Sequence, residues 1–220
     1  MRHFTIELED LKTKLLQMGG MVEAAVHRAV RAVVERDDAL AQKVREGEGA
    51  INTMEMEIDE LATKLLVLQQ PVARDLRFLT SVLKINTDLE RMGDLANNLA
   101  SRAQSLSKLP PLHLDIDIPH MSSLVESMLL KSLDAFLRAD ADLAQEVLMS
   151  DDEVDRIRGE AYGEIVAHMQ TNPSDVQAGV EMIFVVRNLE RIGDHATNMA
   201  EDVIYMAKGV DVRHHAKTSV

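Results

Sequence analysis

The stretch NLERIGDHATNMA, residues 188–200, has a close copy in DLERMGDLANNLA, residues 88–100, one hundred positions earlier. Eight of the thirteen aligned residues are identical, and they include a glutamate, an aspartate and a glycine. A glycine inside a helix costs about 1 kcal/mol relative to alanine, and two carboxylates four positions apart on a helix repel each other. Because both unfavourable choices recur at matching positions, they indicate a duplication under a constraint beyond helix formation.

The similarity between the two halves extends beyond this segment. Residues 40–42 (LAQ) match residues 143–145, and residues 51–52 (IN) match residues 154–155 (VD), at one offset of 103 positions. The offset falls to 100 in the loop that precedes the third helix of each half. Since loops tolerate insertions and packed helices do not, this pattern predicts that the halves are structural repeats.

The composition favours helices over sheets, because aromatic residues make up only 3% of the chain and there are just five prolines. Apolar residues recur every three or four positions in three long segments of each half, and the segments break at Gln70-Pro71 and Asn172-Pro173. We therefore predict an all-α fold of two tandem three-helix bundles. The predicted parts are a first bundle in 1–109, a proline-containing linker in 110–120, a second bundle in 121–208 and a polar tail in 209–220.

The net charge of −13 opposes nonspecific binding to nucleic acid or anionic lipid and favours cationic partners, metal ions included. There is no cysteine, so disulfides and thiolate metal sites are excluded. The N-terminal segment MRHFTIELEDLK contains acidic residues where a signal peptide has an apolar core, and no stretch approaches the roughly 20 apolar residues of a membrane span. We therefore expect a cytoplasmic protein.

Two pairs of carboxylates stand four positions apart in the second half. Glu190 and Asp194 share one face of the last helix, and Asp151 and Asp155 repeat the spacing on the helix before it. If these faces meet, four carboxylates converge, which is costly unless a cation compensates them. Oxygen ligands favour Mg²⁺, Ca²⁺, Mn²⁺ or iron, so the pattern predicts multinuclear metal binding. The glycine before Asp194, Gly193, is expected to let a neighbouring helix approach closely.

Several motifs resemble the PhoU family of phosphate-transport regulators over nearly the whole chain. They are LERMGD (89–94), LERIGDHATNMAE (189–201), LQQPVARDLR (68–77) and the ending YMAKGVDVRH (205–214). In that family such acidic pairs ligate metal clusters, one site per repeat. The resemblance implies multinuclear iron, with zinc, manganese, magnesium or calcium as alternatives. The implied ligands are Asp151, Asp155, Glu190 and Asp194 in the second bundle, and Glu48, Asn52, Glu90 and Asp94 in the first.

Asn52 departs from the acidic pattern, although its amide oxygen can still act as a ligand. The resemblance further implies a negative regulator of phosphate uptake and of phosphate-starvation signalling, and not an enzyme. Its expected partners are the ATPase of the phosphate ABC transporter, PstB-like, and a PhoR-like sensor histidine kinase. We also expect a homodimer, and membrane association only through those partners.

Two other interpretations remain open from the residues alone. One is a carboxylate-bridged di-metal enzyme in a helical bundle, although none of the eight histidines follows a glutamate at the Glu-x-x-His spacing of such enzymes. The other is a metal-free helical scaffold whose acidic faces are merely solvated. His195 directly follows Asp194 and points about 100° away on the helix, so we expect it to be a surface residue.

Overall fold

The computed structural model describes residues 2–212, which form six α-helices, one short 3-10 helix and no strand. The predicted all-α fold of two three-helix bundles is confirmed. The elements are α1 (Arg2–Glu35), α2 (Asp38–Gln69), α3 (Ala73–Leu106), α4 (Ile118–Arg138), α5 (Ala141–Thr171), η1 (Pro173–Asp175) and α6 (Val176–Lys208).

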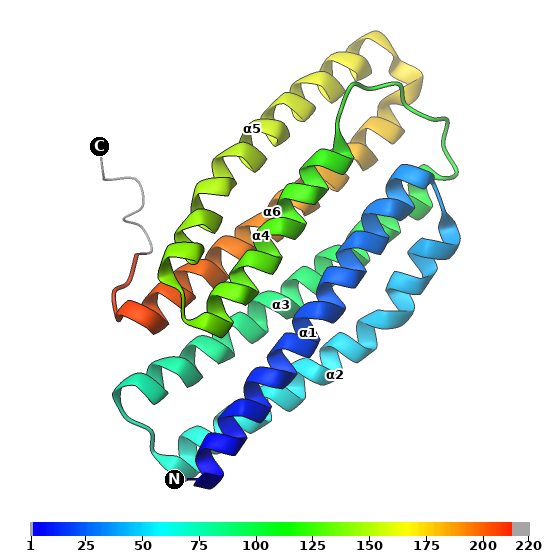
Figure 1. Cartoon of the computed structure of the whole chain (residues 1–220). Coiled ribbons are helices and arrows are strands. Elements are labelled where there is room, and N and C mark those ends of the chain that lie inside the picture. The colour runs from blue at the N-terminus through cyan, green and yellow to red at the C-terminus, as the bar shows by residue number, and fades with distance from the viewer. Residues whose placement is uncertain (1, 213–220) are drawn as a thin grey trace, which may run out of the picture.

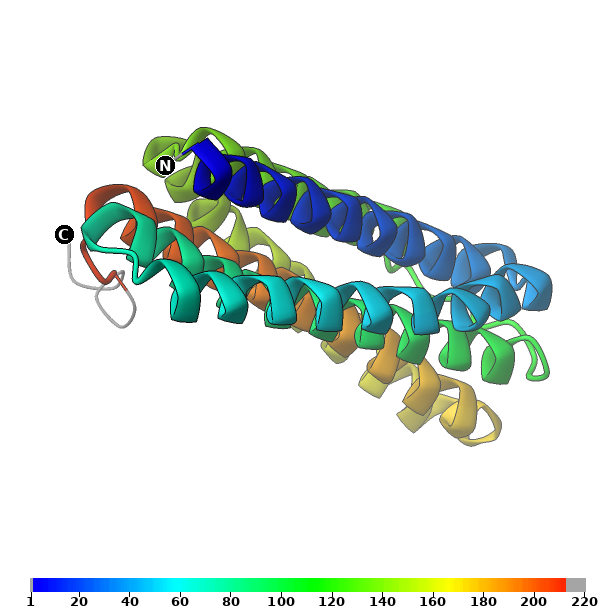
Figure 2. The same ribbon diagram turned by 90° about the horizontal axis from the view of Figure 1, so that it is seen from below.

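The two bundles lie side by side, with α1 to α3 in the first and α4 to α6 in the second (Figure 1). Helices α3 and α6 pack against each other more extensively than any other pair in residues 2–212, and α1 packs against α4 (Figure 2). The buried apolar side chains form one continuous core through both bundles. The rings of Phe78 in α3 and Phe136 in α4 stack across the junction between the bundles, with their centroids 5.6 Å apart. The repeats therefore share their interior.

The turn between the first and second helices is built in the same way in both bundles. Arg36 and Ala139 end the first helices in the left-handed conformation, with φ of 54° and 52°. The next residues, Asp37 and Asp140, cap the following helices by accepting hydrogen bonds from two backbone N–H groups each. These positions are 103 residues apart, so the duplication includes the caps.

Helix α4 begins at Ile118, inside the segment 110–120 that the sequence predicts as linker. Asp117 accepts a hydrogen bond from the backbone N–H of His120 at 2.9 Å and so caps the helix. Pro119 lies in the first turn, where a missing N–H leaves no helical hydrogen bond unmade. This proline therefore helps to begin a helix, whereas Pro71 and Pro173 follow the ends of helices.

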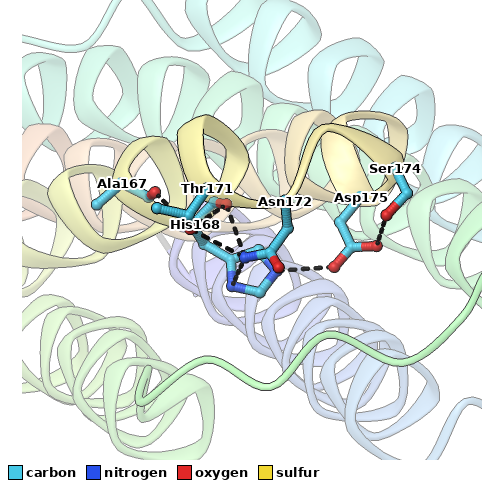
Figure 3. Close-up of polar contacts among 6 residues, drawn as sticks. All are labelled: Ala167, His168, Thr171, Asn172, Ser174 and Asp175. Carbon is cyan, nitrogen blue, oxygen red and sulfur yellow. Dashed lines mark hydrogen bonds and ion pairs between the residues drawn. The ribbon is translucent and has the colours of Figure 1, made fainter.

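Polar contacts hold the turn between α5 and α6 (Figure 3). The backbone N–H of Asn172 donates to the carbonyl of His168 at 2.8 Å, and Nε2 of His168 lies 2.9 Å from Oδ2 of Asp175. Ser174 Oγ donates to the other oxygen of Asp175 at 3.1 Å. His168 and Ser174 together lower the pKa of Asp175. In the matching turn of the first bundle, Gln70 and Ala73 instead have φ near 45°, an uncommon conformation outside glycine.

Helix α6 ends at Lys208, as predicted, where Gly209 adopts φ of 71° and its N–H donates to the carbonyl of Tyr205. Of the predicted tail 209–220, residues 213–220 lie outside the described residues. Among residues 2–212, no helix combines the length and the apolar character needed to cross a membrane.

Candidate metal centre

The four predicted ligands of the second bundle converge on one surface formed by α5 and α6. The pKa of Asp151 is raised to about 6, first by burial and then by the charges of Asp194 and Asp155. The pKa of Asp194 is raised as well, again by desolvation and by Asp155, although its side chain remains more exposed than that of Asp151. The carboxylates of the two helices therefore act on one another, so the two acidic faces meet.

An arginine that the sequence analysis missed lies among these carboxylates. Nη1 of Arg158 donates to Oε1 of Glu190 at 2.8 Å, and its Nη2 lies 3.3 Å from Oδ1 of Asp155. The pKa of Glu190 is nevertheless raised, because burial and the charge of Asp194 together outweigh the lowering effect of Arg158. Arg158 thus supplies part of the positive charge that the sequence analysis assigned to a metal ion.

In the first bundle the predicted ligands lie on α2 and α3. Glu48 accepts a hydrogen bond from Nδ2 of Asn97 at 2.7 Å, whereas Asn52 is exposed. The pKa of Glu90 is raised, first by burial and then by the charge of Asp94, with a further contribution from Glu55. Glu55, Glu90 and Asp94 therefore form a carboxylate cluster that spans α2 and α3.

Glu55 is the second residue that the sequence analysis missed. At the offset of 103 positions it aligns with Arg158, so the same place in the repeat holds a negative charge in one bundle and a positive charge in the other. It also supplies a carboxylate three positions after Asn52, where the acidic pattern is interrupted. The offset alone could have identified both residues.

The two repeated glycines differ in how closely their neighbours approach. A Cβ atom added to Gly93 would lie 3.2 Å from Cδ1 and Cγ2 of Ile51, which is tighter than ordinary packing. A Cβ on Gly193 would lie 3.6 Å from Cγ1 of Val154, an ordinary van der Waals distance. The prediction that a neighbouring helix comes too close to Gly193 for a side chain is therefore wrong for a methyl group, which would fit there. The close approach occurs at Gly93 instead.

His195 is not the surface residue that its direction on the helix predicted. Its Nδ1 lies 2.8 Å from Oδ1 of Asp88, and both side chains are largely buried, with exposed fractions of 16% and 14%. Asn198 adds a longer contact to the same oxygen at 3.5 Å. The expectation failed because it considered α6 alone, whereas α3 covers this side of the helix. His195 thus joins the two bundles.

Both clusters offer oxygen donors suited to a hard cation. As the side chains of residues 2–212 stand, however, no three or more histidine, aspartate or glutamate groups are close enough together to hold a metal ion. In the second bundle Arg158 occupies the space between Glu190 and Asp155. The donor set and the raised pKa of Asp151 nevertheless fit a cation, because a positive ion would stabilise a carboxylate whose ionised form is disfavoured by burial and by its acidic neighbours.

Comparison with known proteins places this arrangement in a family. The model of the PhoU domain matches twice, at residues 15–103 and 118–203. A "Phosphate-specific transport system accessory protein PhoU homolog" from Pseudomonas aeruginosa is 44% identical over 216 residues, covering 97% of this chain and 88% of that protein. A homologue of the same name from Aquifex aeolicus is 36% identical, covering 94% of each chain.

Two solved structures agree with the fold. The crystal structure of PhoU from Pseudomonas aeruginosa superposes with a TM-score of 0.91 at 44% identity, covering 94% of this chain and all of that one. The crystal structure of the phosphate transport system regulatory protein PhoU from Streptococcus pneumoniae superposes with a TM-score of 0.88 at 28% identity, covering 95% of this chain and 99% of that one. Since sequence, repeat and fold all agree over nearly the full length, the chain belongs to the PhoU family.

Proposed function

We propose that this protein is a negative regulator of phosphate uptake and of phosphate-starvation signalling. The observation that carries the proposal is the match to phosphate-specific transport accessory proteins over 97% of the chain, with both repeats present. The protein acts by binding other proteins and not by catalysis. Its partners are the ATPase subunit of the phosphate ABC transporter and the sensor histidine kinase. By binding both at the cytoplasmic face of the membrane, it conveys the activity of the transporter to the kinase.

The surface of the protein suits such an adaptor. Many of the carboxylates behind the net charge of −13 lie exposed on long helices, so a partner with a basic surface would be attracted electrostatically. Association of this kind weakens as salt rises, because exposed charges are screened beyond about 8 Å at physiological ionic strength. Binding that is independent of salt would point to an apolar interface instead.

A metal ion at each carboxylate cluster forms part of the proposal. The ligands would be Asp151, Asp155, Glu190 and Asp194 in the second bundle, and in the first Glu48, Asn52, Glu90 and Asp94, with Glu55 as an additional donor. Iron is the expected metal, with zinc, manganese, magnesium or calcium as alternatives. A bound cation would neutralise the repulsion within each cluster and fix the surface between the second and third helices of each bundle.

Deletion of the gene in its host tests the regulatory function. Phosphate-starvation genes should then be expressed in phosphate-rich medium, and the intact gene should restore repression. In parallel, the immobilised protein should retain the transporter ATPase or the kinase at low salt and release it at high salt. Normal repression in the deletion strain, together with no retention of either partner, would contradict the proposal. Light scattering of the purified protein tests the expected homodimer.

A further inference from the structure

A shallow hollow lies between α5 and α6, beside the carboxylates of the second bundle. Its volume is about 570 Å³. Although the protein is strongly acidic, arginines outnumber carboxylates around this hollow. Its polar lining consists of Arg158, Tyr162, Arg187, Glu190, Arg191 and Asp194.

Two of the three arginines are available for a ligand. Arg158 already donates to Glu190, but Arg187 and Arg191 are exposed, and neither forms an ion pair with another residue in 2–212. Both nevertheless line the hollow, together with Glu190 and Asp194. The hollow therefore holds positive charge whose donors are not used by the protein itself.

The combination of arginines with a carboxylate selects among anions. Guanidinium groups present paired N–H donors that match the oxygens of a tetrahedral oxyanion. A carboxylate repels a fully ionised anion but accepts a hydrogen bond from one that keeps a proton. At neutral pH inorganic phosphate keeps at least one hydroxyl, whereas sulfate keeps none. A site with both kinds of group therefore favours phosphate, because sulfate would leave Asp194 facing a negative oxygen.

We propose that this hollow binds inorganic phosphate, with Arg187 and Arg191 donating to its oxygens and Asp194 accepting a hydrogen bond from its hydroxyl. The inference rests on the proposed function and deepens it, because it gives the regulator a direct contact with the ion whose supply it reports. It adds a ligand to the second bundle that requires no metal.

The first bundle lacks this combination of residues, so one phosphate is bound per chain. Of the three arginines in the hollow, only Arg191 has an arginine at its aligned position. The aligned pairs are Arg158 with Glu55, Tyr162 with Asp59, Arg187 with Thr87, and Arg191 with Arg91.

Calorimetric titration of inorganic phosphate into the full-length, chelator-treated protein tests the site, and removing metal makes the result independent of the metal proposal. We expect saturable binding of one phosphate per chain. Arg187→Gln and Arg191→Gln should each weaken it at least about tenfold, because each removes a hydrogen bond to a charged group. Arg91→Gln, at the aligned place in the first bundle, should leave it unchanged. Circular dichroism should show all three variants to be as helical as the parent.

Selectivity gives a second measurement. Sulfate should bind at least about tenfold more weakly than phosphate, and Asp194→Asn should reduce this preference. No saturable phosphate binding, equal binding of sulfate, or no effect of Arg187→Gln would overturn the proposal. Measuring whether the same protein retains its partners distinguishes failure of the phosphate site from failure of the proposed regulatory function. A protein that retains its partners but binds no phosphate loses only this site, and one that binds phosphate but retains no partner loses only the regulatory function.

Discussion

In the second bundle Arg158 donates to Glu190 and approaches Asp155, whereas at the aligned position of the first bundle Glu55 adds a negative charge beside Glu90. The two clusters share the spacing of their carboxylates and differ in how that charge is compensated. The second bundle contains an internal cation, and the first has one carboxylate replaced by the amide of Asn52. The duplicated framework thus keeps three of its four carboxylate positions and differs in the residues around them.

The largest expected difference concerns metal content. Glu190→Gln with Asp194→Asn should remove metal from the second bundle, and Glu90→Gln with Asp94→Asn from the first, each lowering affinity at its own cluster by at least about tenfold. Asn52→Asp should strengthen metal binding at the first cluster, because it adds the charge that Asp155 supplies at the aligned position of the second. Elemental analysis of the purified proteins measures both effects. Unchanged metal content in the second-bundle variant, with helical circular dichroism intact, would remove the site assignment.

The next largest effect is the change in the free energy of unfolding when Arg158 or its aligned residue Glu55 is substituted. The sign of this change should differ between the two bundles. In chelator-treated protein Arg158→Gln should lower the free energy of unfolding by about 1–3 kcal/mol, because the largely buried Glu190 loses its charged donor. Glu55→Gln should instead raise it by roughly 0.2–0.5 kcal/mol, since it removes a like charge near Glu90. Urea denaturation measures both values. Equal signs would show that the aligned residues are not the source of the difference.

The pH dependence of Asp151 reports how much burial and the neighbouring carboxylates together disfavour its ionised form. Its pKa rises from 3.8 to about 6 on folding, so ionising it costs stability as pH rises through this range. Asp151→Asn should therefore stabilise the metal-free protein by about 1–2 kcal/mol above pH 6, allowing for its partial exposure, and the gain should vanish below about pH 4. Thermal unfolding at several pH values tests this.

The aligned first-bundle variant, Glu48→Gln, is the control for that measurement. Its amide oxygen can still accept the hydrogen bond from Asn97, so no comparable gain is expected. A gain from Asp151→Asn that persists unchanged at pH 4 would show that charge is not its cause.

The smallest effect concerns the glycines. Gly193→Ala should stabilise the protein by up to about 1 kcal/mol, because helix propensity improves and the methyl group fits beside Val154. At Gly93 the gain should be smaller or reversed, because Ile51 would have to move. Melting temperatures of the two alanine variants decide the matter. A larger gain at Gly93 would contradict the packing difference.

Much of the fold could be predicted from the sequence because its determinants are local. Apolar periodicity and the breaks before Pro71 and Pro173 identify the helices, and a constant offset identifies the repeat. The carboxylate faces follow from i, i+4 spacing in the same way. Pro119 is an instructive exception, because proline ends a helix at one position and begins it at another, and the cap of Asp117 decides which.

The contacts between helices could not be predicted from one helix at a time. The position of His195 on α6 predicts a surface residue, because nothing in α6 indicates that Asp88 of α3 faces it. The position of Gly193 in the sequence does not reveal how close Val154 of the neighbouring helix lies. Arg158 is different, because its alignment with Glu55 is visible in the sequence once charge reversal between the repeats is examined.

The core shared by α3 and α6 has a consequence for how the chain could be divided. A break within residues 107–117 would sever the covalent link, but the stacked rings of Phe78 and Phe136 and the ion pair of Lys84 with Asp202 would still join the fragments. Each fragment expressed alone would expose the apolar side of α3 or α6 to water, so we expect the two to be soluble only when co-expressed. A single repeat would need a second copy to cover that side, and in this chain the other repeat takes that place through the α3–α6 contact.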